Sequence, residues 1–400
     1  MEPQIIPRDS HTVSRKQISP AAVKVLYDLN EAGYTAYLAG GGVRDLLLGR
    51  KPKDFDVATS ATPEEVRKVF RNCRLIGRRF RLAHVFFRDE IVEVSTFRAL
   101  TPAADAEEHQ FLTKDGLVLR DNVFGTAEED ALRRDFTVNA LFYNIDDFSI
   151  IDYVHGLRDI ELRTIRVIGN PELRFTEDPV RILRAVRFAA SLDFQIEETA
   201  RAAITKTAGL LDGCSSSRLY EEILKLTGCG KSIRVFQLFR ELDILEHLFP
   251  ELAAWLNAPD GDGKTHWLEK SFAQIDRWRT AGLPLDPALI FALIFGEYHE
   301  WVAQQLMKTE KLSYSVAQHE AVGRHLRQLD RICIPKSIRH RIAQIMAMQQ
   351  RFLRTTPLCY QRFSVHRAFL DAFLYFKFAV RTTGRHATEL NWWEQQRKTK

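Results

Sequence analysis

The sequence predicts an α+β protein, with a small mixed β-sheet and helices in its first part and an all-helical remainder. Short runs of β-favouring residues, such as residues 34–39 and 91–98, occur before residue 160. After residue 226 the pattern changes to amphipathic helices rich in Leu, Ile and Phe, for example at 235–249 and 287–295. A sheet-containing region is therefore expected to precede a helical one.

A chain of 400 residues is longer than one hydrophobic core usually supports, so several domains are expected. We predict a loose lead-in at 1–17, a sheet-containing head at 18–160, a helical neck at 161–230 and a helical body at 231–400 with a short basic tail. No apolar run reaches the about 18 residues of a membrane span. The five scattered cysteines form no C-x-x-C pair, which favours reduced thiols in the cytoplasm.

A glycine turn follows the first predicted strand, within the segment YLAGGGVRDLLLGRKPKDFDVAT at 37–59. Gly40 and Gly41 open it, residues 43–48 have helical character, and Gly49 reads as the helix stop. A strand, a glycine turn and a helix start bring backbone N–H groups close to an anion, and Arg44 can pair with phosphate oxygens. The turn is neither a Walker A loop nor G-x-G-x-x-G, because Asp45 occupies the last glycine position.

Asp54 and Asp56 form a D-F-D element directly after this turn. In an extended strand both carboxylates share one face, with Cα atoms roughly 6–7 Å apart. Mg²⁺ is usually held by one or two carboxylates plus substrate phosphates, which such a pair suits. The alternative is two solvated acids beside a turn.

The combination GGGVRDLLLG and DFD resembles the first signature of the class II nucleotidyltransferases, the family of bacterial poly(A) polymerases and CCA-adding enzymes. This resemblance implies that Asp54 and Asp56 bind the catalytic Mg²⁺ and that a third carboxylate lies on a later strand. Glu93 is the candidate, because alternation in residues 91–98 puts it on the face opposite Val92 and Val94. The alternative for Glu93 is a salt bridge to a nearby arginine.

Residues 66–88 contain no acid and are rich in basic side chains, which would attract RNA or a nucleotide. The alternative interpretation, an exposed basic helix face that binds no ligand, is equally compatible with this charge pattern. Residues 75–85, LIGRRFRLAHV, resemble the stretch that marks the bacterial poly(A) polymerases of the family. Three arginines there are candidates for binding the RNA strand or the triphosphate: Arg78, Arg79 and Arg81.

Residues 133–140, RRDFTVNA, resemble a further family signature and are expected to be helical. Arg134 would then meet phosphate, while Asp135 and Asn139, four residues apart, share a face near the ribose. The resemblance implies that Asp135 belongs to the active centre, so it is a catalytic candidate. The alternative is an Arg-Asp pair that holds the helix to the sheet.

A base-reading element is predicted at Glu177, Asp178 and the residues after them, EDPVRILRAVRFAA. Asp178 before Pro179 suits a helix N-cap, and the following arginines step by three along one side. The run resembles the family's ED-x-x-R element, which implies that Asp178 and Arg181 read adenine. Capping and a solvated helix face are the alternatives. The nucleotide-binding candidates of this element are Glu177, Asp178, Arg181, Arg184 and Arg187.

The resemblance covers residues 18–226 and implies template-independent transfer of AMP from ATP to RNA 3′ ends, feeding RNA decay. Partners from RNA decay or RNA chaperoning would fit this role, although the sequence shows none. The long Arg/Lys-rich tail of many relatives is largely missing, which puts tail-assisted RNA binding in doubt. Two alternatives stay open: a tRNA CCA-adding enzyme and a catalytically silent RNA-binding member of the fold.

Overall fold

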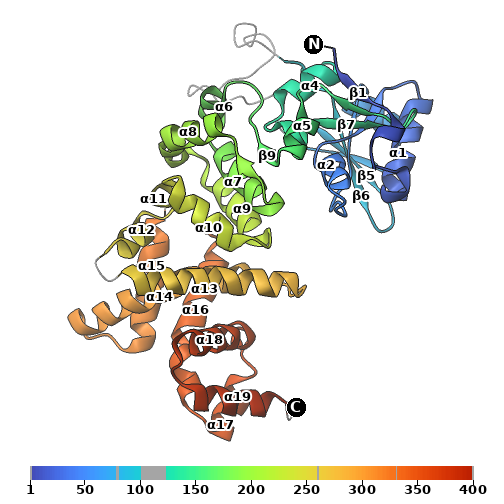
Figure 1. The fold of residues 1–400 in the computed structure, drawn as a ribbon. Helices are drawn as coiled ribbons and strands as arrows, with labels where there is room; N and C mark the ends of the chain where they lie inside the picture. The colour runs from blue at the N-terminus through green and yellow to red at the C-terminus, as the bar shows by residue number, and fades with distance from the viewer. Residues whose placement is uncertain (1, 78–80, 101–122, 259–260, 330, 399–400) are drawn as a thin grey trace. The chain divides into compact units, whose positions relative to one another are not determined.

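The computed structural model describes residues 2–77, 81–100, 123–258, 261–329 and 331–398 (Figure 1). The chain separates into two compact units. We call Met1–Arg174 with Phe194–Ala200 the head unit, and Phe175–Asp193 with Arg201–Lys400 the helical unit. The strands lie in the blue-to-green part of the ribbon and the yellow-to-red part is helical, which confirms the predicted α+β class.

The head unit is built on an eight-stranded mixed sheet in the order β1-β8-β7-β2-β3-β6-β5-β4. Strands β3 and β6 run parallel, whereas the other neighbouring pairs are antiparallel. The strands are β1 Gln4–Ile6, β2 Ala36–Ala39, β3 Asp56–Thr59, β4 Cys73–Ile76, β5 Leu82–Phe86, β6 Ile91–Thr96, β7 Leu141–Asn144 and β8 Ile150–Asp152.

Helices α1 (Pro20–Glu31) and α3 (Pro63–Val69) cover one face of this sheet. Their apolar side chains pack in one core cluster with Val57, Val92 and Val94, which are almost completely buried. The predicted alternation of residues 91–98 is thus confirmed, because Val92 and Val94 enter the core while Glu93 between them points to the opposite face.

The N-terminal residues are part of the sheet, so the predicted loose lead-in at 1–17 is wrong. Strand β1 pairs antiparallel with β8, and Val13 is fully buried. Without β1, β8 would be an edge strand with unpaired backbone groups, and the N-terminal segment satisfies those groups.

The other elements of the head unit are a two-stranded sheet and short helices, of which α6 continues into the helical unit. Strands β9 (Thr164–Ile165) and β10 (Gln195–Ile196) form a separate parallel pair. The remaining helices here are η1 Arg8–Ser10, η2 Arg15–Gln17, α2 Gly41–Leu47, α4 Ala127–Arg133, η3 Thr137–Asn139, α5 Gly156–Glu161 and α6 Pro171–Glu177.

The helical unit contains α-helices and short 3-10 turns throughout its described residues. The predicted helix at 235–249 is divided in two, because Asp243 adopts a left-handed conformation with φ +55°. No described helix is long and apolar enough to cross a membrane. The elements are α7 Val180–Leu192, α8 Glu198–Thr207, η4 Ala208–Gly213, α9 Ser216–Gly228, α10 Ser232–Glu241, α11 Ile244–Leu248, α12 Pro250–Leu256, α13 Gly261–Thr280, α14 Pro287–Thr309, α15 Tyr314–Gln328, α16 Lys336–Ala347, η5 Gln349–Leu353, α17 Pro357–Phe363, α18 Phe369–Thr383 and α19 Ala387–Lys398.

The division between the two units falls near residue 174 and not at 160 or 230. A division into two units does not test the predicted separation into head, neck and body, which stays a prediction. The molecule is described below as the head unit and the helical unit.

Candidate functional site

The glycine turn connects β2 directly to α2. Gly40 has φ +73°, a conformation that favours glycine, and α2 begins at Gly41, two residues earlier than predicted. A Cβ at position 40 would lie 2.8 Å from Nη1 of Arg134, so only glycine lets this guanidinium approach. Gly40 also offers no side chain to cap α2, which leaves the first N–H groups of the helix for a ligand or water.

The acids of the predicted metal site lie beside this turn. Asp56 is the first residue of β3 and stands opposite Ala39, the last residue of β2. Asp54 precedes the strand, so the D-F-D element is only partly a strand. Its carbonyl oxygen would be 3.4 Å from a Cβ at Gly42, which places Asp54 against the start of α2.

Asp56 has an unusual electrostatic environment. Its side chain is accessible to solvent, but the protein groups around it desolvate the carboxyl and raise its pKa to about 6, with further contributions from the negative charges of Glu93 and Asp54, whereas Arg134 opposes the rise. Within the described ranges, no three His, Cys, Asp or Glu side chains are yet gathered into a metal-binding group. The oxygen donors suit a hard divalent cation, and binding one would require the three carboxylates to move closer together.

Among the described residues, Glu93 forms its ion pair with a histidine, whereas the alternative prediction was a salt bridge to an arginine. His84 lies directly opposite Glu93 on β5, with Nε2 3.3 Å from Oε2. The sequence does not reveal this contact, because it depends on the register between β5 and β6.

Arg44 is turned into the protein, and its predicted contact with phosphate stays a prediction. It is only 7% exposed, and its guanidinium donates to Oδ1 of Asp45 at 2.7 Å and to the amide oxygen of Asn139. The amide nitrogen of Asn139 in turn donates to Asp135 at 3.4 Å. These contacts tie the start of α2 to the segment that follows α4.

The predicted helix at 133–140 is wrong. Helix α4 ends at Arg133, Arg134 is extended, and only a short 3-10 turn follows at Thr137–Asn139. The backbone here pairs with another segment instead, since Ile168 N donates to Asp135 O and Thr137 N donates to Arg166 O. Phe136 in this segment is completely buried.

A buried carboxylate on α4 holds Arg134 in place. Both Nε and Nη2 of Arg134 donate to Oδ2 of Asp130, which is 3% exposed, and Nη1 donates to Asn139 O. The guanidinium also stacks 5.2 Å above the Phe142 ring. Asp130 is not among the predicted site residues, because it belongs to none of the motifs that the sequence shows.

The predicted base reader lies in the helical unit. Helix α7 begins after Pro179 without a side-chain cap, so the predicted capping role of Asp178 is wrong. Oδ2 of Asp178 instead accepts from Arg218 on α9 at 2.8 Å. Its Oδ1 is buried and has no hydrogen-bond partner among the described residues. The carboxylate is thus fixed on one side and unsatisfied on the other.

The three arginines of α7 share one partly exposed side, as predicted. Arg181 pairs with Glu177 at 3.0 Å. Arg187 pairs with the buried Glu222 of α9 and lies 4.4 Å above the Phe188 ring. Arg187 therefore links two helices internally, which differs from the nucleotide contact expected for it.

The basic stretch at 75–85 is described only in part. Arg81 pairs with Glu64 of α3 at 2.6 Å. Arg78 and Arg79 lie outside the described residues, so the predictions for them are not tested.

Three family descriptions match the chain. Residues 36–166 match "Poly A polymerase head domain", and residues 193–256 match "Probable RNA and SrmB- binding site of polymerase A". Residues 310–400 match "Polymerase A arginine-rich C-terminus", although we expected the long basic tail to be largely missing.

Curated relatives resemble the chain over most of its length. It is 43% identical to Poly(A) polymerase I of Salmonella typhi, covering 98% of this chain and 85% of that protein. It is 37% identical to Poly(A) polymerase I of Haemophilus influenzae, over 96% and 85%. A CCA-adding enzyme of Lactobacillus johnsonii is 38% identical but matches 58% of this chain and 56% of its own length.

Solved structures share the fold. The CCA-adding enzyme of Bacillus stearothermophilus in complex with CTP superposes with a TM-score of 0.64 at 28% identity, over 95% of this chain and 82% of that one. The Thermotoga maritima CCA-adding enzyme complexed with tRNA gives a TM-score of 0.61 at 20% identity, over 99% and 85%, which shows a likeness of fold.

Proposed function

Because the chain belongs to the poly(A) polymerase family and is a nucleotidyltransferase, we propose that it extends RNA 3′ ends with AMP from ATP, without a template, and releases pyrophosphate. One observation favours polyadenylation over CCA addition. The similarity to Poly(A) polymerase I spans 98% of the chain, whereas the CCA-adding enzyme of L. johnsonii, at comparable identity, matches 58%.

In the head unit, we assign Asp54, Asp56 and Glu93 to Mg²⁺ binding. Bound Mg²⁺ would supply positive charge to stabilise the reacting oxygens of the 3′-OH and the triphosphate. The raised pKa of Asp56, which comes first from desolvation and then from the negative charges of Glu93 and Asp54, supports this assignment, because a bound cation would stabilise the charged carboxylates. His84 orients Glu93 from the neighbouring strand.

The triphosphate is assigned to the turn at Gly40 and Gly41 and to Arg134. The uncapped N–H groups of α2 and the guanidinium provide donors for phosphate oxygens. Asp130 holds Arg134 in its orientation, so we regard Asp130 as a positioning residue. Asp135 stays the proposed active-centre acid, near the ribose.

Arg44 and Asp45 are best assigned to positioning as well. Since Arg44 is buried and already bonded to Asp45 and Asn139, its charge serves the protein more than a phosphate. Asp45 holds Arg44, and Arg44 in turn keeps Asn139 beside Asp135, where both can contact the sugar.

Asp178 and Arg181 are proposed to select adenine. The unsatisfied Oδ1 of Asp178 can accept from the adenine amino group, while Arg218 fixes Oδ2. Arg181 can donate to a ring nitrogen. Because Asp178 does not cap α7, base contact and helix capping do not compete. Arg184 on the same side, and Glu177 bonded to Arg181, complete the proposed element.

A primer-extension experiment tests the function. An oligo(A) primer is incubated with Mg²⁺ and each nucleotide separately, and a long ladder with ATP only is expected. Addition of two C residues and one A to a truncated tRNA would show the second candidate, the CCA-adding activity of the related enzymes. No incorporation would favour an RNA-binding member without catalysis.

Base selection is tested by Arg181→Ala, with Arg201→Ala as the matched control. Arg201 is also an arginine in the helical unit paired with a glutamate, but it lies on α8. We expect only Arg181→Ala to lower the preference for ATP over CTP. An unchanged preference contradicts the assignment of Arg181.

We further propose a cytoplasmic location. The five cysteines are all unpaired thiols, as expected in a reducing compartment. Partners from RNA decay or RNA chaperoning remain part of this proposal.

A further inference from the structure

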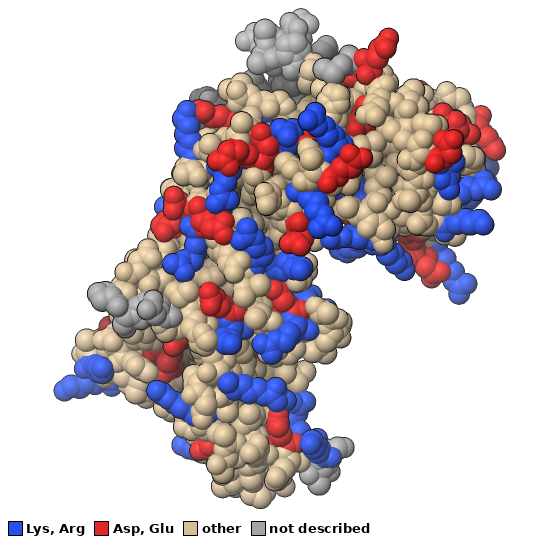
Figure 2. Space-filling model, in the orientation of Figure 1, with Lys and Arg blue, Asp and Glu red and all other residues tan. Residues whose placement is uncertain are grey.

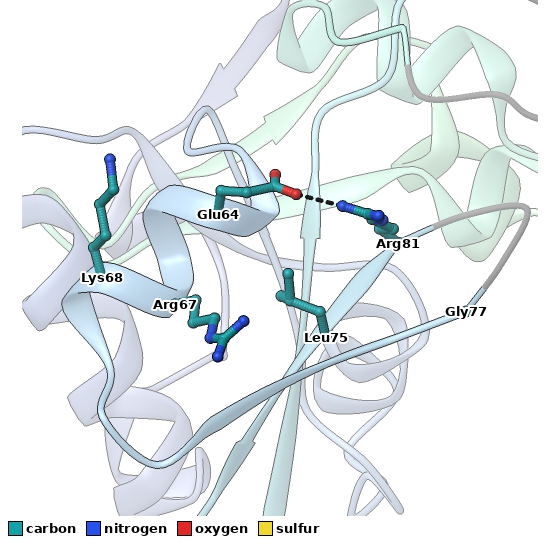
Figure 3. A pocket seen from close by; sticks show the side chains of 6 residues that line it. All are labelled: Glu64, Arg67, Lys68, Leu75, Gly77 and Arg81. Atoms are coloured by element: carbon teal, nitrogen blue, oxygen red, sulfur yellow. Dashed lines mark hydrogen bonds and ion pairs between the residues drawn. The ribbon is translucent and has the colours of Figure 1, made fainter.

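A cleft of about 640 Å³ opens in the head unit between α3 and the hairpin formed by β4 and β5. Three of its side chains are basic, one is acidic and one is aliphatic (Figure 3). Figure 3 shows Arg67 reaching from α3 toward the hairpin, with Lys68 at the end farther from Arg81. The lining residues are Glu64, Arg67, Lys68, Leu75, Gly77 and Arg81.

This cleft belongs to the sheet face that α3 covers, and not to the face of the proposed metal site. Leu75 packs against the same core cluster as Val92 and Val94. Glu93 alternates with those two valines and therefore points away from α3. A molecule in the cleft is consequently separated from the carboxylates by the sheet, so the cleft is not the binding place of the reacting nucleotide.

The cations of the cleft are available to a ligand. Arg67 and Lys68 are exposed, and neither makes a hydrogen bond or an ion pair with a described residue. Arg81 is paired with Glu64 at 2.6 Å, but both side chains are more than half exposed. An ion pair this exposed contributes little to stability, so a phosphate can replace the carboxylate at little cost.

We propose that this cleft binds the phosphodiester backbone of RNA upstream of the 3′ end. Naming RNA as the polyanion rests on the proposed function. An open, cationic cleft suits a passing chain, because its described basic side chains bind phosphate groups and not base edges. Binding is therefore independent of sequence, and Glu64 acts as an internal counter-ion that a phosphate displaces from Arg81.

Neutralising the two free cations tests the proposal. Arg67→Gln/Lys68→Gln is compared with Lys16→Gln/Arg158→Gln, which removes the same charge from exposed head residues outside the cleft. Fluorescence anisotropy follows binding of a long and a short oligo(A) without ATP, at several salt concentrations.

We expect the cleft variant to bind long oligo(A) about fivefold to tenfold more weakly than the control, with the slope of log K against log salt reduced by about 1.4 for two lost single-strand contacts. Equal affinity and slope in the two variants would overturn the proposal. Because no nucleotide is present, this result is independent of whether the enzyme prefers ATP or CTP.

Glu64→Gln gives a second, opposite test. It frees Arg81 from its counter-ion, so RNA should bind severalfold more tightly at low salt, with little change in melting temperature. Weaker or unchanged RNA binding would instead identify the Glu64–Arg81 pair as a latch between α3 and the hairpin, and would contradict the counter-ion role.

Discussion

In the head unit, two buried carboxylates are met by arginines. Asp130 pairs with Arg134, and Asp159, 1% exposed, accepts from Arg166 and from the hydroxyl of Thr137. The helical unit also contains such a pair, between Glu222 and Arg187, but its polar atoms Glu297 Oε2, His299 Nδ1 and His325 Nε2 are buried without a hydrogen-bond partner among the described residues.

Burial has different consequences in the two units. In the head, paired charges orient the side chains around the proposed site, as Asp130 does for Arg134. In the helical unit, burial shifts the pKa values of the polar groups, lowering those of His299 and His325 and raising that of Glu297 to about 7. We therefore test the head by removing a buried partner and the helical unit by changing the pH, while the raised pKa of Asp56 shows that desolvation shifts a pKa in the head as well. Charges of both signs are interspersed over the visible surface (Figure 2). The expected responses to loss of a partner and to pH therefore follow from the buried groups and not from the surface charge.

The largest expected effect is on catalysis. Asp56→Ala should lower the rate of AMP transfer by about a hundredfold to a thousandfold or more, because it removes a proposed metal ligand. The melting temperature should not fall, since the raised pKa of Asp56 marks a carboxylate that the fold does not stabilise in its charged form. Primer extension and thermal denaturation measure the two quantities.

Asp89→Ala is the control for this change, because Asp89 is an exposed acid in the same unit. Near-normal extension by the Asp56 variant would show that the metal assignment is wrong. A large loss of stability would show instead that Asp56 belongs to the paired framework of the head.

Next in size is the loss of a buried pair in the head. Asp159→Ala leaves Thr137 without its acceptor and Arg166 with only Glu197 as a partner, and should lower the free energy of unfolding by about 2 to 3 kcal/mol. Chemical denaturation measures it, again beside Asp89→Ala. Equal stability of the two variants would contradict the view that paired charges hold the head together.

The buried histidines should make the helical unit sensitive to acid. Burial lowers the pKa of both, so below pH 6.5 the unfolded chain takes up protons that the folded unit does not. Stability should fall by up to about 1.4 kcal/mol per pH unit and per histidine. In His299→Leu/His325→Leu this slope should be smaller, as melting temperatures between pH 7.5 and 5.5 would show. A slope equal to that of the wild type contradicts the prediction.

The smallest effect has the opposite sign. The pKa of Glu297 is raised by burial, although Lys264 opposes the rise, so its folded form holds a proton that the unfolded form releases above pH 4.5. Stability contributed by this proton is lost as pH rises through about 7. Glu297→Gln should therefore raise the melting temperature by about 2–4 °C at pH 8 and change it little at pH 5.

The exposed Glu221 provides the control for this change, as Glu221→Gln. Equal effects of the two substitutions at pH 8 would show that the environment of Glu297 does not disfavour its charge.

Local patterns predicted the elements whose contacts are local. Alternation around Glu93 gave the correct faces of β6, and Gly49, with φ +66°, follows the end of α2 as expected. Patterns failed where a distant segment competes. The segment after Arg133 is extended because it pairs with residues 166–168, and Asp178 does not cap α7 because Arg218, forty residues later, binds it.

By itself, the sequence determined the chemistry that is available: a glycine turn, two aspartates two residues apart, a third acid on an alternating strand, and an acid–arginine pair for the base. These depend on residue type and short spacing, which a chain carries without folding. The tertiary structure decided which groups are free to use. Strand register gave Glu93 its histidine, and packing turned Arg44 inward and left Oδ1 of Asp178 unsatisfied. Burial and partnership arise between distant segments, so only the fold assigns them.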